Sequence, residues 1–206
     1  MILRTFYTGP LAVNCYVATD EASKKTFVVD PGGHNDDMVN YIKGNNLEIE
    51  YIILTHGHGD HIGGVSDLMT EFQGAKLVAC IYDKALLEDP NLNMSTMVYG
   101  HPISLTADQY VTDGETLKVG DLELRFLHTP GHTPGGMCIV VENVVFTGDT
   151  LFEQSIGRTD FPGSSYPAIV NSIREKLFAL PDTTKVLPGH MGPTSIGFEK
   201  ENNPFV

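Results

Sequence analysis

Residues 55–61, with the sequence Thr-His-Gly-His-Gly-Asp-His, constrain the fold of this chain more than any other stretch. They follow the apolar run 51–54, which predicts a buried strand, and they precede residues 62–69, which begin a helical pattern. Three histidines and an aspartate therefore stand in a loop between the end of a strand and a helix. In open α/β arrangements, ligands bind at this edge of the sheet.

The side chains of this loop favour a metal site. Imidazole nitrogen and carboxylate oxygen both bind zinc, and imidazole also suits iron. His56 and His58 are two residues apart, so their side chains point the same way in an extended segment. Asp60 and His61 follow in a glycine-rich turn and can form a second group. Together with ligands from elsewhere in the chain, these side chains exceed the number that one tetrahedral ion needs, which indicates two metals. The alternative is a chance cluster of histidines on a polar loop.

Three further candidate ligands each follow a predicted strand. His132 lies in the Pro/Gly-rich loop 128–136, Asp149 follows Gly148, and His190 ends the sequence Pro-Gly-His. Each of them alone would be an ordinary turn residue. If the strand ends gather at one edge of the fold, all three converge on the first cluster.

Composition and charge exclude several classes of protein. The chain has 206 residues, of which 41% are hydrophobic, and we expect a single domain over residues 1–206. The net charge of −13 argues against a nucleic-acid-binding surface. We find no run of about 18 apolar residues that would predict a membrane span. The N-terminus lacks the basic and apolar regions of a signal peptide, so we expect a cytoplasmic protein. Its oligomeric state is not predicted.

The three cysteines, Cys15, Cys80 and Cys138, each lie in an apolar stretch. Their number is odd and their spacing suggests no pairing. We expect buried free thiols rather than a disulfide framework.

The remaining pattern predicts two sheets packed face to face with helices outside. Residues 90–110 are irregular, and a functional loop and a plain surface connection are both open for them. Helices are predicted from Asn35 or Asp36 to about Gly44, from Asp83 to Glu88, and from about Tyr166 to Leu180 after a cap at Ser164 or Ser165. Other strands are predicted at Ile2 to Tyr7, Val13 to Thr19, Thr26 to Asp30, Lys76 to Cys80, Asp121 to His128, Met137 to Val141, Val144 to Phe146 and Lys185 to Leu187.

From Asp30-Pro31-Gly32-Gly33 to Pro188-Gly189-His190, the chain resembles the metallo-β-lactamase-fold hydrolases. It is most similar to their short bacterial glyoxalase II-like (hydroxyacylglutathione hydrolase-like) branch. The resemblance implies an α/β fold, the four-layer αββα sandwich. It also implies a bridging role for Asp149, where β-lactamases proper carry a cysteine, which argues against antibiotic hydrolysis. The implied ligands of one metal are His56, His58 and His132, and those of the other are Asp60, His61 and His190.

The activity that this resemblance implies is hydrolysis of a small thioester such as S-lactoylglutathione. A hydroxide that bridges two divalent ions would attack the carbonyl, with Asp60 as the catalytic residue that orients it. Zinc is the expected metal, and iron or manganese would also suit these ligands. Only residues 191–206 follow the last ligand, so we expect no C-terminal helical domain of the kind that holds glutathione in glyoxalase II proper. The thiol carrier therefore stays open.

The segment Gly157-Arg158-Thr159-Asp160-Phe161 also resembles one found in persulfide dioxygenases. Those enzymes share the fold but use a single non-haem iron, which the resemblance places on His56, His132 and Asp149. This is the alternative function. Arg158 could bind a substrate carboxylate, or it could form a structural salt bridge with Asp160.

Four other residues have open roles. We expect His34 to be a turn residue and His101 a loop residue, whereas His128 could support the metal site or be a buried structural histidine. Asp30 could orient a ligand histidine through its ring N–H, or its carboxylate could cap a turn.

Two other classes of protein are less favoured. A non-catalytic metal-binding domain is disfavoured because the ligand set leaves room for water and a substrate. A nuclease of this fold is disfavoured by the net charge of −13.

Overall fold

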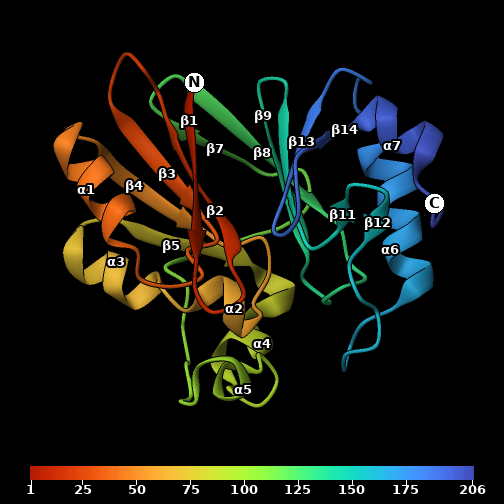
Figure 1. The fold of residues 1–206 in the computed structure, drawn as a ribbon, viewed down its shortest axis with the longest axis horizontal. Coiled ribbons are helices and arrows are strands. Elements are labelled where there is room, and N and C mark those ends of the chain that lie inside the picture. Colours follow the sequence, from red (N-terminus) through yellow and green to blue (C-terminus); the bar gives the residue numbers. More distant parts are fainter.

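A computed structural model, which describes residues 1–206, contains two six-stranded sheets that pack face to face (Figure 1). Helices cover the outer face of each sheet, so the predicted four-layer αββα sandwich is confirmed. No helix in it is both long enough and apolar enough to cross a membrane.

The first sheet holds the N-terminal half of the chain in the order β1-β2-β3-β4-β5-β6. β1, β2 and β3 are antiparallel neighbours, whereas β3, β4, β5 and β6 run parallel. The strands are β1 (Ile2–Thr8), β2 (Val13–Thr19), β3 (Lys25–Val29), β4 (Glu48–Ile53), β5 (Lys76–Cys80) and β6 (Gln109–Val111). The helices of this half are α1 (Asp36–Gly44), α2 (Gly59–Ile62), α3 (Val65–Glu71), α4 (Lys84–Glu88) and α5 (Ser95–Tyr99), with a 3₁₀ turn at Ile81–Asp83.

The second sheet has the order β14-β13-β10-β9-β8-β7. Its strands are β7 (Thr116–Val119), β8 (Leu122–His128), β9 (Met137–Val141), β10 (Val144–Gly148), β13 (Lys185–Pro188) and β14 (Thr194–Ser195). The short strands β11 (Leu151–Phe152) and β12 (Ser155–Ile156) form a separate hairpin. α6 (Tyr166–Ser172), a π-helical turn at Ile173–Leu177 and α7 (Ile196–Asn202) complete this half.

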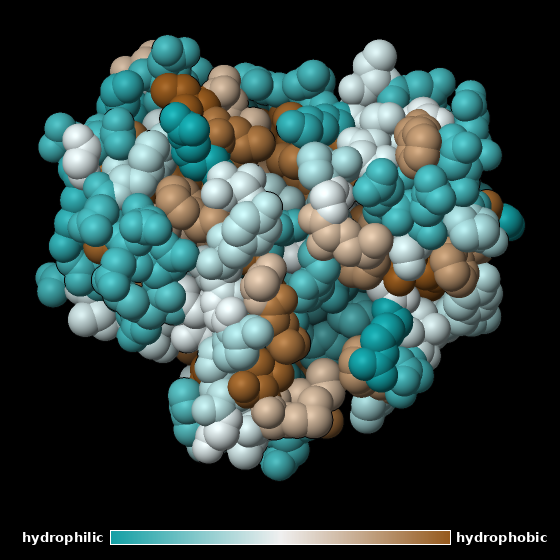
Figure 2. Space-filling view, in the orientation of Figure 1, coloured by the Kyte–Doolittle hydropathy of each residue, from teal (hydrophilic) through white to brown (hydrophobic).

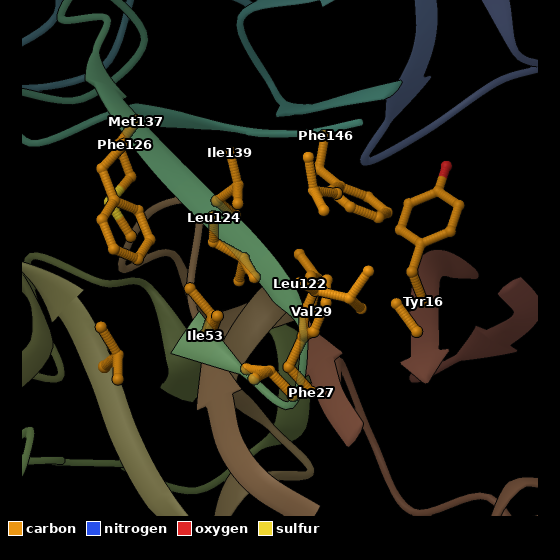
Figure 3. Close-up of a cluster of buried hydrophobic side chains, with 14 of the residues drawn as sticks. Tyr16, Phe27, Val29, Ile53, Leu122, Leu124, Phe126, Met137, Ile139 and Phe146 are labelled. Atoms are coloured by element: carbon orange, nitrogen blue, oxygen red, sulfur yellow. The ribbon is translucent and has the colours of Figure 1, made fainter. Parts of the chain in front are cut away.

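The space between the sheets is filled by a cluster of 18 buried residues drawn from both of them. Phe146 of β10 belongs to this cluster, with its ring centroid 5.1 Å from that of Tyr16 and 5.9 Å from that of Phe27 (Figure 3). Tyr16 and Phe27 belong to the first sheet, so this aromatic contact joins the two halves. Two smaller clusters pack the helices onto the outer faces.

Strand direction brings several loops to one edge of the sandwich. β10 runs parallel to β13 and antiparallel to β9, which is itself antiparallel to β8, so β8, β10 and β13 all point the same way. Backbone bonds then join their loops to the first sheet: Met137 N–H donates to the Thr55 carbonyl at 2.9 Å, and Asn14 N–H donates to the Gly189 carbonyl at 2.8 Å. The ends of strands from both sheets therefore meet.

Most predicted elements are confirmed, and the differences are short elements without a clear pattern. The elements that were not predicted are β6, β7, β11, β12, β14, α2, α5 and α7, and α5 lies inside the segment 90–110 that the sequence left irregular. The helix expected from Tyr166 to Leu180 changes to π-helical geometry after Ser172, although its apolar positions are buried as expected. Asn35 and Ser165 cap their helices. All three cysteines are free and buried.

Phe146→Ala should destabilise the protein strongly, because Phe146 is fully buried between the sheets. Removing a buried phenyl ring typically costs about 3–5 kcal/mol of unfolding free energy. Urea unfolding followed by far-UV circular dichroism would measure this. Phe205→Ala is the control, since Phe205 is 44% exposed and should change the unfolding free energy little. Equal effects of the two substitutions would contradict the central role of Phe146.

Candidate metal centre

All seven predicted ligands lie at the edge where the strand ends meet. His56 and His58 follow β4, and Asp60 and His61 stand in the first turn of α2. His132 lies in the loop from β8 to β9, Asp149 follows β10, and His190 follows β13. Each sheet thus contributes side chains to one cluster.

The cluster contains two groups of three, each with its potential ligand atoms within 4.8 Å of one another. Asp149 lies between the groups: its Oδ1 is 3.4 Å from His61 Nε2, and its Oδ2 is 3.6 Å from His132 Nε2 and 3.8 Å from His190 Nε2. The family resemblance implies the same grouping, and metal binding by these residues stays a prediction. The first group is His56, His58 and His132, and the second is Asp60, His61 and His190.

The hydrogen bonding of the cluster fits a bound cation. His56 Nε2, His61 Nε2 and Asp149 Oδ1 are buried and have no hydrogen-bond partner in the protein. Leaving a buried polar atom without a partner costs free energy, so such atoms are rare in native proteins. Imidazole nitrogens and carboxylate oxygens are ligands of zinc, iron and manganese. Divalent ions would therefore satisfy the atoms that the protein leaves unpaired.

Asp30 fixes which nitrogen of two histidines faces the cluster. Its Oδ1 accepts a bond from Thr55 N–H at 2.7 Å, and its Oδ2 accepts from Thr55 Oγ1 at 2.6 Å. Since the Thr55 hydroxyl donates to Asp30, the His56 Nδ1–H at 3.1 Å must donate to that hydroxyl. His61 Nδ1–H donates to Asp30 Oδ2 at 3.0 Å. Both imidazoles therefore turn an Nε2 lone pair towards the cluster, as ligand histidines do when the other nitrogen is bonded.

These bonds also decide the role of Asp30. Asp30, His56 and His61 form a third group whose ligand atoms lie close together. The Asp30 oxygens already accept three hydrogen bonds, so this carboxylate is placed to orient histidines rather than to bind a metal. Of the two roles open from the sequence, the geometry supports the first.

The two remaining histidines of the first group face each other. His132 Nδ1–H donates to the carbonyl of Arg158 at 2.8 Å, which leaves its Nε2 free. That Nε2 lies 2.9 Å from His58 Nδ1. Two ring nitrogens at this distance either share a proton or both donate lone pairs to one cation.

Burial and neighbouring charges set the protonation of these groups. Burial, together with the adjacent His132, lowers the pKa of His58 to about 3. Burial also lowers the pKa of His56 well below its usual value. For Asp149, burial raises the pKa, but His61 and the other histidines lower it further, and the net change is downward. Neutral His56 and His58 and an ionised Asp149 are forms that bind metals. For His61 and His190, burial lowers the pKa, but the neighbouring carboxylates raise it further, and the net change is upward.

Asp83, which was not predicted, ties the two loops of the first group together. Its carboxylate accepts bonds from Gly57 N–H at 3.0 Å, Thr133 Oγ1 at 2.8 Å and Gly135 N–H at 2.6 Å. Gly57 stands between His56 and His58, and the other two donors follow His132. A single aspartate at the start of a predicted helix carries no signal for such a role in the sequence.

A cleft of about 320 Å³ opens over the cluster. The segment 90–110 contributes part of its wall, from residues 94, 97 and 98. This supports the functional interpretation of that segment over a plain surface connection. The lining residues are Leu11, His58, Asp60, Met94, Met97, Val98, His132, Asp149, Phe152, Arg158, Phe161 and His190.

Arg158 lines this cleft but already has a partner. Its Nε and Nη2 donate to the two carboxylate oxygens of Asp160 at 2.9 and 2.7 Å, and its guanidinium lies 4.3 Å from the centroid of the Phe161 ring. The salt bridge considered from the sequence is therefore present. A role for Arg158 in substrate binding stays a prediction.

The three other histidines lie outside the cluster. His34 is exposed and pairs with Asp36, and His101 is exposed beside Tyr99. His128 is half-buried, stacks on Tyr82 and bonds to the Pro134 carbonyl. It thus contacts the loop that carries His132 without contacting a candidate ligand.

Residues 8–190 match the family model of the metallo-beta-lactamase superfamily. Among curated relatives, hydroxyacylglutathione hydrolase GloC of Haemophilus influenzae is 36% identical over 94% of this chain and 92% of its own length. The probable metallo-hydrolase YqgX of Bacillus subtilis is 34% identical over 98% of this chain and 96% of its own length.

Three solved structures are also similar over nearly the whole chain. The BLEG-1 B3 metallo-beta-lactamase has a TM-score of 0.92 and 36% identity, covering 99% of both chains. TTHA1623, solved in a di-iron-bound form, has a TM-score of 0.86 and 30% identity, covering 98% of this chain and all of its own. ETHE1 from Myxococcus xanthus has a TM-score of 0.84 and 30% identity, covering 99% of this chain and 84% of its own.

Thr55→Val should lower metal affinity without unfolding the protein. The valine keeps the shape of threonine but removes the acceptor for His56 Nδ1–H, so the ring is no longer held in one orientation. Losing such a supporting bond typically weakens metal binding about 10- to 100-fold. Competition with a chromogenic chelator would measure the change. Thr70→Val is the control, because Thr70 is exposed on α3 and its hydroxyl donates to the Ser66 carbonyl rather than bonding to a candidate ligand. Unchanged affinity in Thr55→Val would contradict this orienting role.

Proposed function

The chain belongs to the metallo-beta-lactamase superfamily, and from its site we propose that it is a dinuclear metal-dependent hydrolase of a small thioester such as S-lactoylglutathione. The observation that carries the proposal is the pair of three-residue groups with Asp149 between them and unpaired lone pairs directed inward. Two similarities support it. GloC is named a hydroxyacylglutathione hydrolase, and TTHA1623 is described as di-iron-bound.

In this proposal the residues divide between two ions as the sequence suggested. His56, His58 and His132 would hold one ion, and Asp60, His61 and His190 would hold the other, with Asp149 between the two groups. When bound, such ions supply a lowered pKa for water and a polarised carbonyl. Zinc is the expected metal, and iron or manganese also suit the ligands.

The protein's own contribution is to position the reacting groups and to restrict water. Asp60 lines the cleft with its Oδ2 3.3 Å from His190 Nε2, and a carboxylate there can accept a hydrogen bond from the attacking water and so orient it. A thioester releases a thiolate, which is stable as an anion near its ordinary pKa of about 8.5, so no side chain needs to protonate it. Phe161 packs against His58 and His132, with ring centroids 5.2 and 5.7 Å apart, and covers one side of the cluster.

We expect the metal-replete protein to hydrolyse S-lactoylglutathione and Asp60→Ala to lower kcat by about 100-fold or more, since it removes both a ligand and the orienting carboxylate. The decay of thioester absorbance would measure the rate. Asp67→Ala is the control, because Asp67 is exposed and does not line the cleft. No turnover by the zinc-, iron- or manganese-loaded protein would exclude this substrate.

A second candidate function is that of a persulfide dioxygenase with a single non-haem iron. The segment that resembles those enzymes, residues 157–161, contacts the cluster through the Arg158 carbonyl and the Phe161 ring. It would use only His56, His132 and Asp149 as ligands. The two candidates therefore differ in whether the second group is needed.

His190→Ala separates these candidates. In a dinuclear hydrolase it should abolish most thioester turnover and reduce the metal content from two ions to about one. In a single-iron dioxygenase, oxygen consumption with glutathione persulfide should stay within about threefold of the wild type. Metal content by mass spectrometry and an oxygen electrode would measure both. We would include a β-lactam among the substrates, because the 36% identity to BLEG-1 weakens the argument from Asp149 against antibiotic hydrolysis.

A further inference from the structure

The lining of the cleft bears on which thioester the protein accepts, an inference that rests on the proposed function. We propose that the substrate group bound next to the scissile carbonyl is apolar and carries no carboxylate. Glutathione, with two carboxylates and two amides, would then be a tolerated carrier rather than the preferred one.

Apart from the candidate ligands and Arg158, the wall of the cleft is apolar. Five of the twelve lining residues are the candidate ligands His58, Asp60, His132, Asp149 and His190, and one is Arg158. All others are apolar, namely Leu11, Met94, Met97, Val98, Phe152 and Phe161. No serine, threonine, asparagine, glutamine, tyrosine or lysine side chain lines the cleft. A peptide-like carrier would therefore find few side chains to bond its amides.

Apolar side chains are also exposed at the rim of the cleft. Met97 on α5 is 75% exposed and Leu11 in the β1–β2 turn is 54% exposed, and both line the cleft. Figure 2 shows hydrophobic side chains gathered over the region of α2, α4 and α5, beside a hydrophilic hollow. Exposed apolar side chains at the mouth of a site gain free energy when an apolar group covers them.

The side chains that line the cleft also offer little attraction to a carboxylate. Arg158 is the only cationic residue that lines the cleft, and its bidentate bond with Asp160 makes the pair neutral. Its remaining N–H groups can still donate, but the pair offers no net attraction to a carboxylate. Glu153, next to Phe152, is exposed, and the chain carries a net charge of −13. Outside the metal centre, an anionic carrier therefore approaches a surface of its own sign.

Two thioesters with the same lactoyl group test this proposal. One is S-lactoylglutathione and the other is the lactoyl thioester of benzyl mercaptan, which is apolar and uncharged. We expect kcat/KM to be at least about tenfold higher for the benzyl thioester, because its ring can cover the apolar rim. The same order should appear in calorimetric binding of the two thioether analogues, in which a methylene group replaces the carbonyl, to metal-replete protein.

Three variants test whether the apolar rim and Arg158 determine this substrate preference. Met97→Gln should lower kcat/KM for the benzyl thioester by about fivefold, a larger loss than for S-lactoylglutathione. Leu92→Gln is its matched control on the same segment, since Leu92 is 42% exposed and lies outside the cleft, and both substrates should be unaffected. Asp160→Asn should release Arg158 and raise kcat/KM for S-lactoylglutathione alone by about threefold.

The outcomes distinguish this inference from the proposed function. If both thioesters are hydrolysed but S-lactoylglutathione is preferred and Met97→Gln changes neither, the inference is overturned while the hydrolase assignment stands. If neither thioester is hydrolysed, the proposed function fails, and the binding comparison decides the inference: tighter binding of the glutathione analogue would overturn it.

Discussion

Five imidazoles and two carboxylates converge on one point, and the protein supplies no donors for several of the lone pairs that they bring there. His56 Nε2, His61 Nε2 and Asp149 Oδ1 are buried without partners, and His58 and His132 turn ring nitrogens towards each other at 2.9 Å. A polypeptide gains nothing from such a cluster unless cations occupy it. The loops at this edge therefore hold the candidate ligand side chains in position for metal ions to bind.

Hydrogen bonds from behind hold three of the candidate ligand histidines. Asp30 and Thr55 fix the tautomers of His56 and His61, the Arg158 carbonyl fixes that of His132, and Asp83 joins the loops on either side. The absence of a side chain at Gly189 lets its backbone lie close to two candidate ligands, because a Cβ there would be 2.5 Å from Asp149 Oδ1 and 2.6 Å from His61 Cε1. A side chain there would occupy the space of two ligands. Packing between the sheets, which includes the contacts of Phe146 with Tyr16 and Phe27, joins the two halves that carry these loops.

The sequence predicted which side chains gather in the cluster but not which ones line the cleft, for a physical reason. Residues that can bind metals are rare, and those in residues 55–61 are dense enough to be recognised before the fold is known. Strands such as β8 and β9 are recognised from their apolar patterns. The cleft is lined by Leu11, Met97 and Phe152, common apolar residues from separate loops that only tertiary packing brings together. Asp83 and Thr55 were missed because their partners lie across the fold or behind a ligand. α5 and β14 were missed because such short elements are fixed by their surroundings rather than by their own propensity.

The division of the ligands between the two sheets has a consequence for the order of events during synthesis. The chain leaves the ribosome from its N-terminus, so the first sheet and the four ligands of residues 56–61 emerge before His132, and His190 emerges after β13. An ion captured by the early segment alone would have an incomplete set of ligands and would exchange readily. Full coordination becomes available only when nearly the whole chain has been made and both sheets have docked. The metal centre thus distinguishes a finished molecule from a nascent one, and stable loading with metal is a late step in maturation.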